Sequence, residues 1–300
     1  MDNTQTKAIL GPMRIPFLIL PPVCVAVGTA TAFWSGIELN LLYLALAFIG
    51  ALSSHISVNA FNEYYDFNSG LDFNTRPTPF SGGSGTLPKN PEKAHYALIT
   101  AFATLAATLF IGIYFLFIKG LWLLPLGIIG IVDIVVYTRW LTRSPLICLI
   151  APGLGFGPLM VMGTHFVLSG SYSWTAFIAS LVPFFLVSDL LLLNQFPDVE
   201  ADKGVGRNHL PIVIGRKASV KVYTLFLAGA YMSIILGWLT RILPPESLVA
   251  LVTIALSINI VRGISRYADD IPALIPYMGR NVILTILTPV LLAIGLFLGR

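Results

Sequence analysis

Two short stretches of this sequence place asparagine and aspartate residues at a similar spacing. Each contains Asn-x-x-x-Asp, with a further aspartate shortly after it. The residues are Asn62, Asp66 and Asp72 in the first stretch and Asn194, Asp198 and Asp202 in the second. Residues four apart share one face of a helix, so the asparagine and the aspartate after it point the same way in both stretches. Carboxylates that converge repel one another unless a cation lies between them.

Together the two stretches predict a site for a metal and a diphosphate. Mg²⁺ prefers oxygen ligands and usually binds through one or two carboxylates together with substrate phosphates. We expect Gly70 to break the first helix, so that Asp72 folds back toward Asp66. The glycine-rich run at 81–85 permits close approach of the backbone to a ligand. The remaining phosphate charge needs basic partners, and four basic residues lie in the two stretches or in the turn between two later segments: Arg76, Arg143, Lys203 and Arg207.

Other acidic residues have roles that the sequence leaves open. Glu63 and Glu200 point away from the aspartate face of their helices, and we expect them to be solvated. Asp133 and Asp189 lie inside apolar segments. Asp189 lies roughly 13 Å deeper than Asp198 at the usual helical rise. A proton acceptor, an anchor for an acceptor substrate and a satisfied internal hydrogen bond are all compatible with that position. For any single aspartate at a helix end, the alternative is a carboxylate that merely caps or solvates the helix.

The elements that carry these residues are long apolar segments. Hydrophobic residues make up 56% and charged residues 11% of the 300 positions, and the mean hydropathy is +0.83. A soluble domain has about 25% charged residues, whereas a helix that crosses a bilayer needs about 20 mostly apolar residues. We expect an all-α bundle of nine transmembrane helices that forms one domain over residues 1–300. The predicted segments are 13–34, 40–61, 94–118, 121–136, 145–168, 174–196, 219–239, 247–264 and 282–298.

The basic residues predict which face of the bundle carries the two acidic loops. With the N-terminus in the cytoplasm, most of the 18 lysine and arginine residues fall on the cytoplasmic face, as the positive-inside rule requires. The exceptions are Lys119, Arg241 and Arg300. The motif loops at 59–92 and 194–217 follow the second and sixth segments and then share the cytoplasmic face of the cell membrane. Their similar motifs indicate two halves of one bundle that present matched ligands toward each other.

The paired motifs resemble those of the UbiA superfamily of intramembrane aromatic prenyltransferases. The resemblance covers nearly the whole chain, since nine helices with aspartate-rich motifs after the second and sixth are the plan of that family. The motifs read Asn62-Glu63-Tyr64-Tyr65-Asp66…Gly70-Leu71-Asp72 and Asn194…Asp198…Asp202, the second followed at 206–215 by Gly-Arg-Asn-His-Leu-Pro-Ile-Val-Ile-Gly. Either motif alone would be unspecific, whereas the pair at this spacing is specific.

The resemblance implies transfer of an isoprenyl group from a polyprenyl diphosphate to an aromatic acceptor, with Mg²⁺ as the cofactor. The implied Mg²⁺ ligands are Asp66, Asp72, Asp198 and Asp202. Asp66 and Asp198 would act in catalysis. Basic side chains would stabilise the charge that develops on the leaving diphosphate. Those basic residues are Arg76, Arg143, Lys203 and Arg207, and the residues that bind the diphosphate or prenyl group include Asn62, Asn194, Tyr65 and Tyr137. The two tyrosines would face the allylic cation and stabilise it through their rings. Alternatively, they belong to the belt of aromatic residues at the membrane–water interface.

Within the family, the first motif and the stretch at 156–164 look most like the branch that prenylates 1,4-dihydroxy-2-naphthoate for menaquinone. The turn at 137–143 lacks the glycines expected in that branch and is nearer to the basic turn of hydroxybenzoate enzymes. Prenylation of 4-hydroxybenzoate, homogentisate, or a lipid or porphyrin-type acceptor therefore stays open. The expected partners are the donor, the acceptor and the lipid bilayer, with no nucleic acid; the sequence does not determine an oligomeric state.

Two other classes of membrane protein are alternatives. An ion-coupled secondary transporter also carries intramembrane acids and an internal repeat, but its sites lie near the midplane on broken helices. Here the acidic clusters lie at helix ends beside basic loops. A phosphatidyl transferase would carry one compact aspartate-rich motif with glycine and arginine, rather than two separate motifs.

Overall fold

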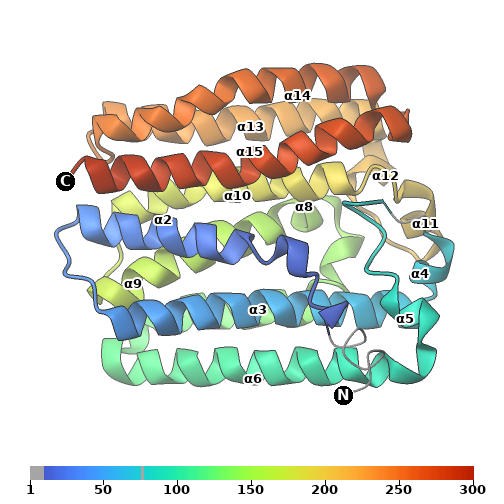
Figure 1. The fold of residues 1–300 in the computed structure, drawn as a ribbon, viewed down its shortest axis with the longest axis horizontal. Helices are drawn as coiled ribbons and strands as arrows, with labels where there is room; N and C mark the ends of the chain where they lie inside the picture. The colour runs from blue at the N-terminus through green and yellow to red at the C-terminus, as the bar shows by residue number, and fades with distance from the viewer. Residues whose placement is uncertain (1–9, 76–77) are drawn as a thin grey trace.

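The computed structural model describes residues 10–75 and 78–300, and within these residues it is helical and contains no β-strand. The predicted all-α class is confirmed. The long helices run nearly parallel to one another (Figure 1). Their bounds are α2 Leu20–Trp34, α3 Leu41–Asn68, α4 Leu71–Asn74, α5 Thr86–Lys89, α6 Ala94–Lys119, α7 Leu124–Val136, α8 Pro145–Leu154, α9 Gly163–Ser169, α10 Trp174–Asn194, α11 Val199–Gly204, α12 Leu210–Ile214, α13 Arg216–Leu239, α14 Ile254–Tyr267 and α15 Ile271–Leu298. A π-helical segment, Gly155–Met162, joins α8 to α9.

Eight helical stretches of the described residues are long and apolar enough to cross a membrane. They are Ile15–Trp34, Leu41–Asn68, Pro91–Lys119, Pro145–Ser169, Trp174–Asn194, Arg216–Leu239, Pro245–Tyr267 and Ile271–Leu298. The ninth predicted segment, Leu121–Val136, is an apolar helix of shorter length. The prediction of nine spans is therefore not confirmed at this segment, while the eight long helices establish an integral membrane protein.

Two helices extend further than the hydropathy pattern predicts. α15 begins at Ile271 instead of 282, and α3 continues past 61 to Asn68, so that Asn62 and Asp66 both lie on this helix. Polar residues at these ends lower the local hydropathy without breaking the backbone hydrogen bonds. Gly70, at φ 79°, then takes the left-handed conformation that glycine adopts without strain, and α4 begins at the next residue. The predicted break at Gly70 is confirmed.

The central helix of the bundle is α10, most of whose side chains are buried. It packs against α2, α8, α13, α15 and the π-helical segment. Small residues permit this close packing in a membrane: a Cβ atom on Gly157 would lie only 2.5 Å from the carbonyl oxygen of Ser180 on α10. By contrast, α6 and α7 expose large apolar side chains such as Phe110, Phe117 and Ile128. That surface is suited to contact with lipid.

The two acidic stretches lie at one end of the bundle. The short helices α4 and α5 follow α3, and α11 and α12 follow α10; all four lie together at the right-hand end of Figure 1. α4 and α11 are in direct contact. The two acidic stretches, which are far apart in the sequence, therefore lie side by side. Much of each stretch forms short helices where the sequence pattern predicted loops.

Candidate functional site

A cavity of about 740 Å³ extends from this end of the bundle into the space between α3, α6, α7 and the π-helical segment. One end of its wall is polar and charged. The polar residues there are Arg14, Asn62, Asp66, Asp72, Asn194, Asp198, Asp202, Arg207 and His209. The other end is lined by apolar side chains that include Ile111, Phe115, Leu116 and Leu126. The cavity can therefore hold a molecule with a charged head and a long apolar tail.

Arg207 joins the two acidic stretches at the charged end. Its guanidinium donates from Nη2 to Oδ1 of Asp66 and from Nη1 to Oδ1 of Asp202, the latter at 2.8 Å. His209 lies 2.8 Å from the other oxygen of Asp202, Oδ2. Burial lowers the pKa of Arg207, but the carboxylates of Asp66 and Asp202 outweigh burial and hold this pKa above its usual value. A permanent cation thus separates two buried carboxylates that would otherwise repel each other.

The other aspartate of each stretch keeps an oxygen atom without a hydrogen bond. Within residues 10–75 and 78–300, Oδ2 of Asp72, Oδ1 of Asp198 and Oδ1 of Asn194 are buried and have no hydrogen-bond partner. All three residues line the charged end of the cavity. Buried acceptors without partners are costly, and an all-oxygen set of this kind suits Mg²⁺. The residues present therefore fit a magnesium ion.

The four predicted aspartate ligands do not form a complete metal site by themselves. In the part of the chain that the structure describes, no three His, Cys, Asp or Glu side chains are grouped closely enough to hold a metal ion. Asp66 and Asp202 are instead occupied by Arg207. Mg²⁺ usually takes only one or two protein carboxylates and completes its ligands with phosphate oxygens and water. The donor set therefore fits a metal that arrives with a diphosphate.

The environment raises the pKa of both aspartates that keep a free oxygen. Burial and the nearby carboxylates of Glu63 and Asp66 raise the pKa of Asp72 to about 7. Burial and the nearby Asp202 likewise raise the pKa of Asp198 to about 7. Since a neighbouring cation favours the charged form of a carboxyl group, a metal bound here would shift both groups toward the carboxylate.

Glu63 is fully buried, so the expectation that it is solvated is wrong. Its Oε1 accepts hydrogen bonds from Nε of Arg14 at 2.9 Å and from the backbone N–H of Ser84 at 2.6 Å. Its Oε2 accepts one from the Ser84 hydroxyl at 2.9 Å. Arg14, just before the first span, and the glycine-rich run both reach this side of α3 through long-range contacts, which the local pattern does not contain. Glu200 is exposed, as expected.

The glycine-rich run, residues 81–85, lies against both acidic stretches. Ser81 and Gly82 line the cavity, and their interaction with Asp198 offsets part of the rise in its pKa that burial causes. Gly83 has a φ of 69°, and a Cβ atom there would lie 3.0 Å from Oδ1 of Asp72. The run therefore approaches Asp72 as closely as a glycine allows, and Glu63 holds it in place through Ser84.

Several other predicted residues also reach the cavity. Asn62 lines it and donates from Nδ2 to the Thr138 hydroxyl at 3.4 Å. Tyr137, at the C-terminal end of α7, lines it as well. Tyr65 does not: it packs beside Phe61, at 6.2 Å between ring centroids, in a separate apolar cluster.

The structure does not bring all four predicted basic residues together. Arg207 is part of the site, but Arg143 and Lys203 are exposed and do not line the cavity. Arg76 lies outside the described residues. Two residues that the sequence reasoning missed, Arg14 and His209, take part instead. His209 lies two residues after Arg207 in the same polar run, and this position was the feature of the sequence that could have identified it as a site residue.

Comparison with known proteins agrees with the fold. A model of the UbiA prenyltransferase family matches residues 19–275. The 1,4-dihydroxy-2-naphthoate octaprenyltransferase of Bacillus subtilis is 28% identical over 248 residues, which cover 80% of this chain and 76% of that protein. The UbiA prenyltransferase domain-containing protein 1 of Xenopus tropicalis is 30% identical over 217 residues, 69% of this chain and 60% of that protein.

Solved structures show the same fold. A UbiA homologue from Aeropyrum pernix K1 superimposes with a TM-score of 0.70 at 17% identity, covering 95% of this chain and 98% of that one. A UbiA homologue from Archaeoglobus fulgidus bound to DMAPP and Mg²⁺ gives a TM-score of 0.54 at 18% identity, covering 95% and 99%.

The helical bundle, together with a cavity that is charged at one end and apolar at the other, defines an integral membrane enzyme whose site suits an amphipathic substrate. The family model covers most of the chain. The chain belongs to the UbiA prenyltransferase family and is a prenyltransferase.

Proposed function

We propose that this chain transfers an isoprenyl group from a polyprenyl diphosphate to 1,4-dihydroxy-2-naphthoate, with Mg²⁺ as cofactor. The observation that carries the proposal is the charged end of the cavity. There Arg207 joins Asp66 and Asp202, while Asp72 and Asp198 keep buried oxygen atoms without partners. A diphosphate and its metal suit this end, and a prenyl chain suits the apolar remainder.

In the proposed reaction, the bond between the prenyl C1 and the diphosphate oxygen breaks, and the diphosphate leaves with the electron pair. C1 then bonds to an electron-rich ring carbon of the acceptor, which loses a proton, or CO₂ when the attacked carbon carries the carboxylate. Bound Mg²⁺ would neutralise charge that develops on the diphosphate. Arg207, with several fixed N–H donors, is suited to phosphate oxygens, and the apolar wall keeps water from the allylic cation.

The choice of acceptor is supported by the relatives rather than by the site. Besides the Bacillus subtilis enzyme, an Escherichia coli protein named 1,4-dihydroxy-2-naphthoate octaprenyltransferase is 25% identical over 327 residues, 99% of this chain and 97% of that protein. The stretch at 156–164, which resembles the same branch, lines the cavity through Phe156, Leu159 and Met160. Mg²⁺ use is supported by the Archaeoglobus fulgidus homologue bound to DMAPP and Mg²⁺. The site faces the cytoplasm in this proposal, as the distribution of basic residues indicates.

An assay in membranes tests the proposal. The purified chain in lipid vesicles is given a radiolabelled isoprenyl diphosphate, with 1,4-dihydroxy-2-naphthoate, 4-hydroxybenzoate or homogentisate, with and without Mg²⁺. We expect labelled prenyl naphthoquinol product only with Mg²⁺ and the naphthoate. Product from a different acceptor would replace the acceptor assignment, and ion-driven uptake of label without any product would contradict the proposal as a whole.

A further inference from the structure

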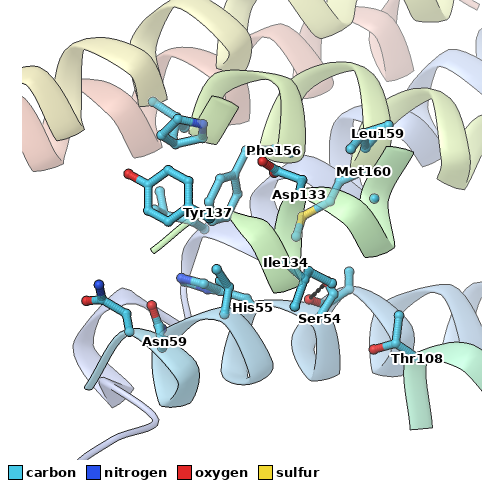
Figure 2. Close-up of a pocket in the computed structure, with 18 of the residues that line it drawn as sticks. Ser54, His55, Asn59, Thr108, Asp133, Ile134, Tyr137, Phe156, Leu159 and Met160 are labelled. Atoms are coloured by element: carbon cyan, nitrogen blue, oxygen red, sulfur yellow. Dashed lines mark hydrogen bonds between the residues drawn. The ribbon is translucent and has the colours of Figure 1, made fainter. Parts of the chain in front are cut away.

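Between its charged end and its apolar end, the cavity has a middle section whose polar groups the diphosphate site does not use. His55 and Asn59 come from α3, Asp133 from α7 and Tyr137 from the end of α7; Phe156 comes from the π-helical segment. Figure 2 shows His55 and Asn59 on one side of the cavity, with Asp133 and Tyr137 on the other. A π-helical segment in a transmembrane helix is rare and often marks a functional site.

His55 presents a polar atom that no described residue satisfies. Its side chain is buried, with 5% of the residue exposed, and its Nδ1 atom has no hydrogen-bond partner in residues 10–75 and 78–300. The ring is held edge-on against Phe156, at 4.9 Å between ring centroids and 85° between planes. A neutral imidazole carries one donor and one acceptor nitrogen. His55 is therefore a fixed group that can hydrogen-bond a ligand in the cavity.

Asp133, which is partly buried, lines the other side of the cavity. It belongs to none of the ion pairs formed by the described residues. Gly155 provides space beside it: a Cβ atom on Gly155 would lie 3.2 Å from Oδ2 of Asp133. A carboxylate that faces an apolar interior without a partner is unfavourable. A prenyl chain cannot satisfy it, whereas a hydroxyl group can.

We infer that this middle section is the subsite for the aromatic acceptor, in which Asp133 and His55 each hydrogen-bond one hydroxyl group of a dihydroxy-aromatic ring. The flat ring lies between the two walls, beside Phe156 and Tyr137. This inference rests on the proposed function and assigns the two residues that select a dihydroxylated ring. The position is adjacent to the charged end, where the reacting carbon of the donor lies. A site built to hydrogen-bond a hydroxyl discriminates strongly against an analogue that lacks it.

The test measures acceptor binding directly, apart from catalysis. Full-length protein in nanodiscs is examined by equilibrium dialysis with radiolabelled 1,4-dihydroxy-2-naphthoate and with 1-hydroxy-2-naphthoate, which lacks one hydroxyl. We expect Asp133→Leu and His55→Leu each to raise the acceptor Kd at least about tenfold. At least one of them should also abolish the preference of the wild type for the dihydroxy ring. Asp133→Asn should keep part of the affinity, and the KM for geranyl diphosphate should stay within about twofold in all variants.

Matched controls make the same changes outside the cavity. Asp269 is an exposed partner of Lys217, and His95 is exposed near the start of α6, so Asp269→Leu and His95→Leu should bind the acceptor like the wild type. An unchanged acceptor Kd in both cavity variants would overturn the inference, as would a change in donor KM alone. If the wild type forms no product with any acceptor, the proposed function fails, while the Kd measurements still decide whether this section binds a dihydroxy ring.

Discussion

The two acidic stretches are similar in their metal-facing groups and different in what holds them. In each, one aspartate is bound by Arg207 and the other keeps a free oxygen: Asp66 with Asp72, and Asp202 with Asp198. The first stretch is held from a distance, because Glu63 binds residues near the N-terminus and in the glycine-rich run. In the second stretch the carboxylate of Asp202 is held by neighbours in the sequence, Arg207 and His209.

This difference indicates a division of roles. The contacts of Asp202 with Arg207 and His209 connect residues that are close in the sequence. The first stretch requires the N-terminal segment and the glycine-rich run to be in place, so its geometry reports on the assembly of the whole charged end. Substitutions of the aspartates should therefore act alike in the two stretches, whereas substitutions of their supports should not.

The largest effects are expected from Asp66→Ala and Asp198→Ala, one residue from each stretch. Both should lower Mg²⁺-dependent prenyl transfer by about 1,000-fold, equivalent to about 4 kcal/mol in the activation free energy, because each removes a carboxylate from the charged end. Transfer is measured in vesicles with labelled donor, and membrane insertion is checked by fractionation. Full activity in either variant would break the assignment of that stretch.

Removal of Arg207 should show that it substitutes for a cation. Breaking a buried ion pair leaves an uncompensated charge and costs about 3 to 5 kcal/mol, so Arg207→Gln should lower the melting temperature in the absence of metal. Mg²⁺ with inorganic diphosphate should restore more stability to this variant than to the wild type. Thermal unfolding in detergent, with and without both ions, is the measurement. Equal ion effects on the two proteins would contradict the idea that Arg207 occupies a cation position.

Substitutions of the residues that hold the aspartates in place should have different effects in the two stretches. Glu63→Gln removes the charge that pairs with Arg14, and we expect kcat/KM to fall about tenfold, since misplacement of binding groups is costly in catalysis. Arg14→Gln should have a similar effect, and the double variant should be no worse than either single one, because the two act through one contact. His209→Gln, which disturbs only local contacts, should cost less. Additive losses for Glu63 and Arg14 would argue against a shared network.

The sequence predicted the parts of this site that depend on local spacing. The pairing of Asn62 with Asp66 and the break at Gly70 follow from helical geometry, and the eight spans follow from the length that a bilayer requires. The burial of Glu63 could not be predicted in this way, because it depends on residues 14 and 84. The π-helical segment could not be predicted either, since its proline and two glycines are compatible with an ordinary kinked helix.

The basic residues show the same limit of prediction from sequence, and substitution of two of them should have the smallest effect on activity. Arg207 and Lys203 lie in one polar run, and Arg143 lies in a turn on the same predicted face, yet only Arg207 of these three lines the cavity. Charge alone could not distinguish them. Arg143→Gln and Lys203→Gln should therefore change kcat/KM by less than about twofold, since exposed charges interact weakly. Steady-state kinetics at two salt concentrations checks this result. A tenfold loss in either variant would mean that the side chain moves to the diphosphate when substrate binds.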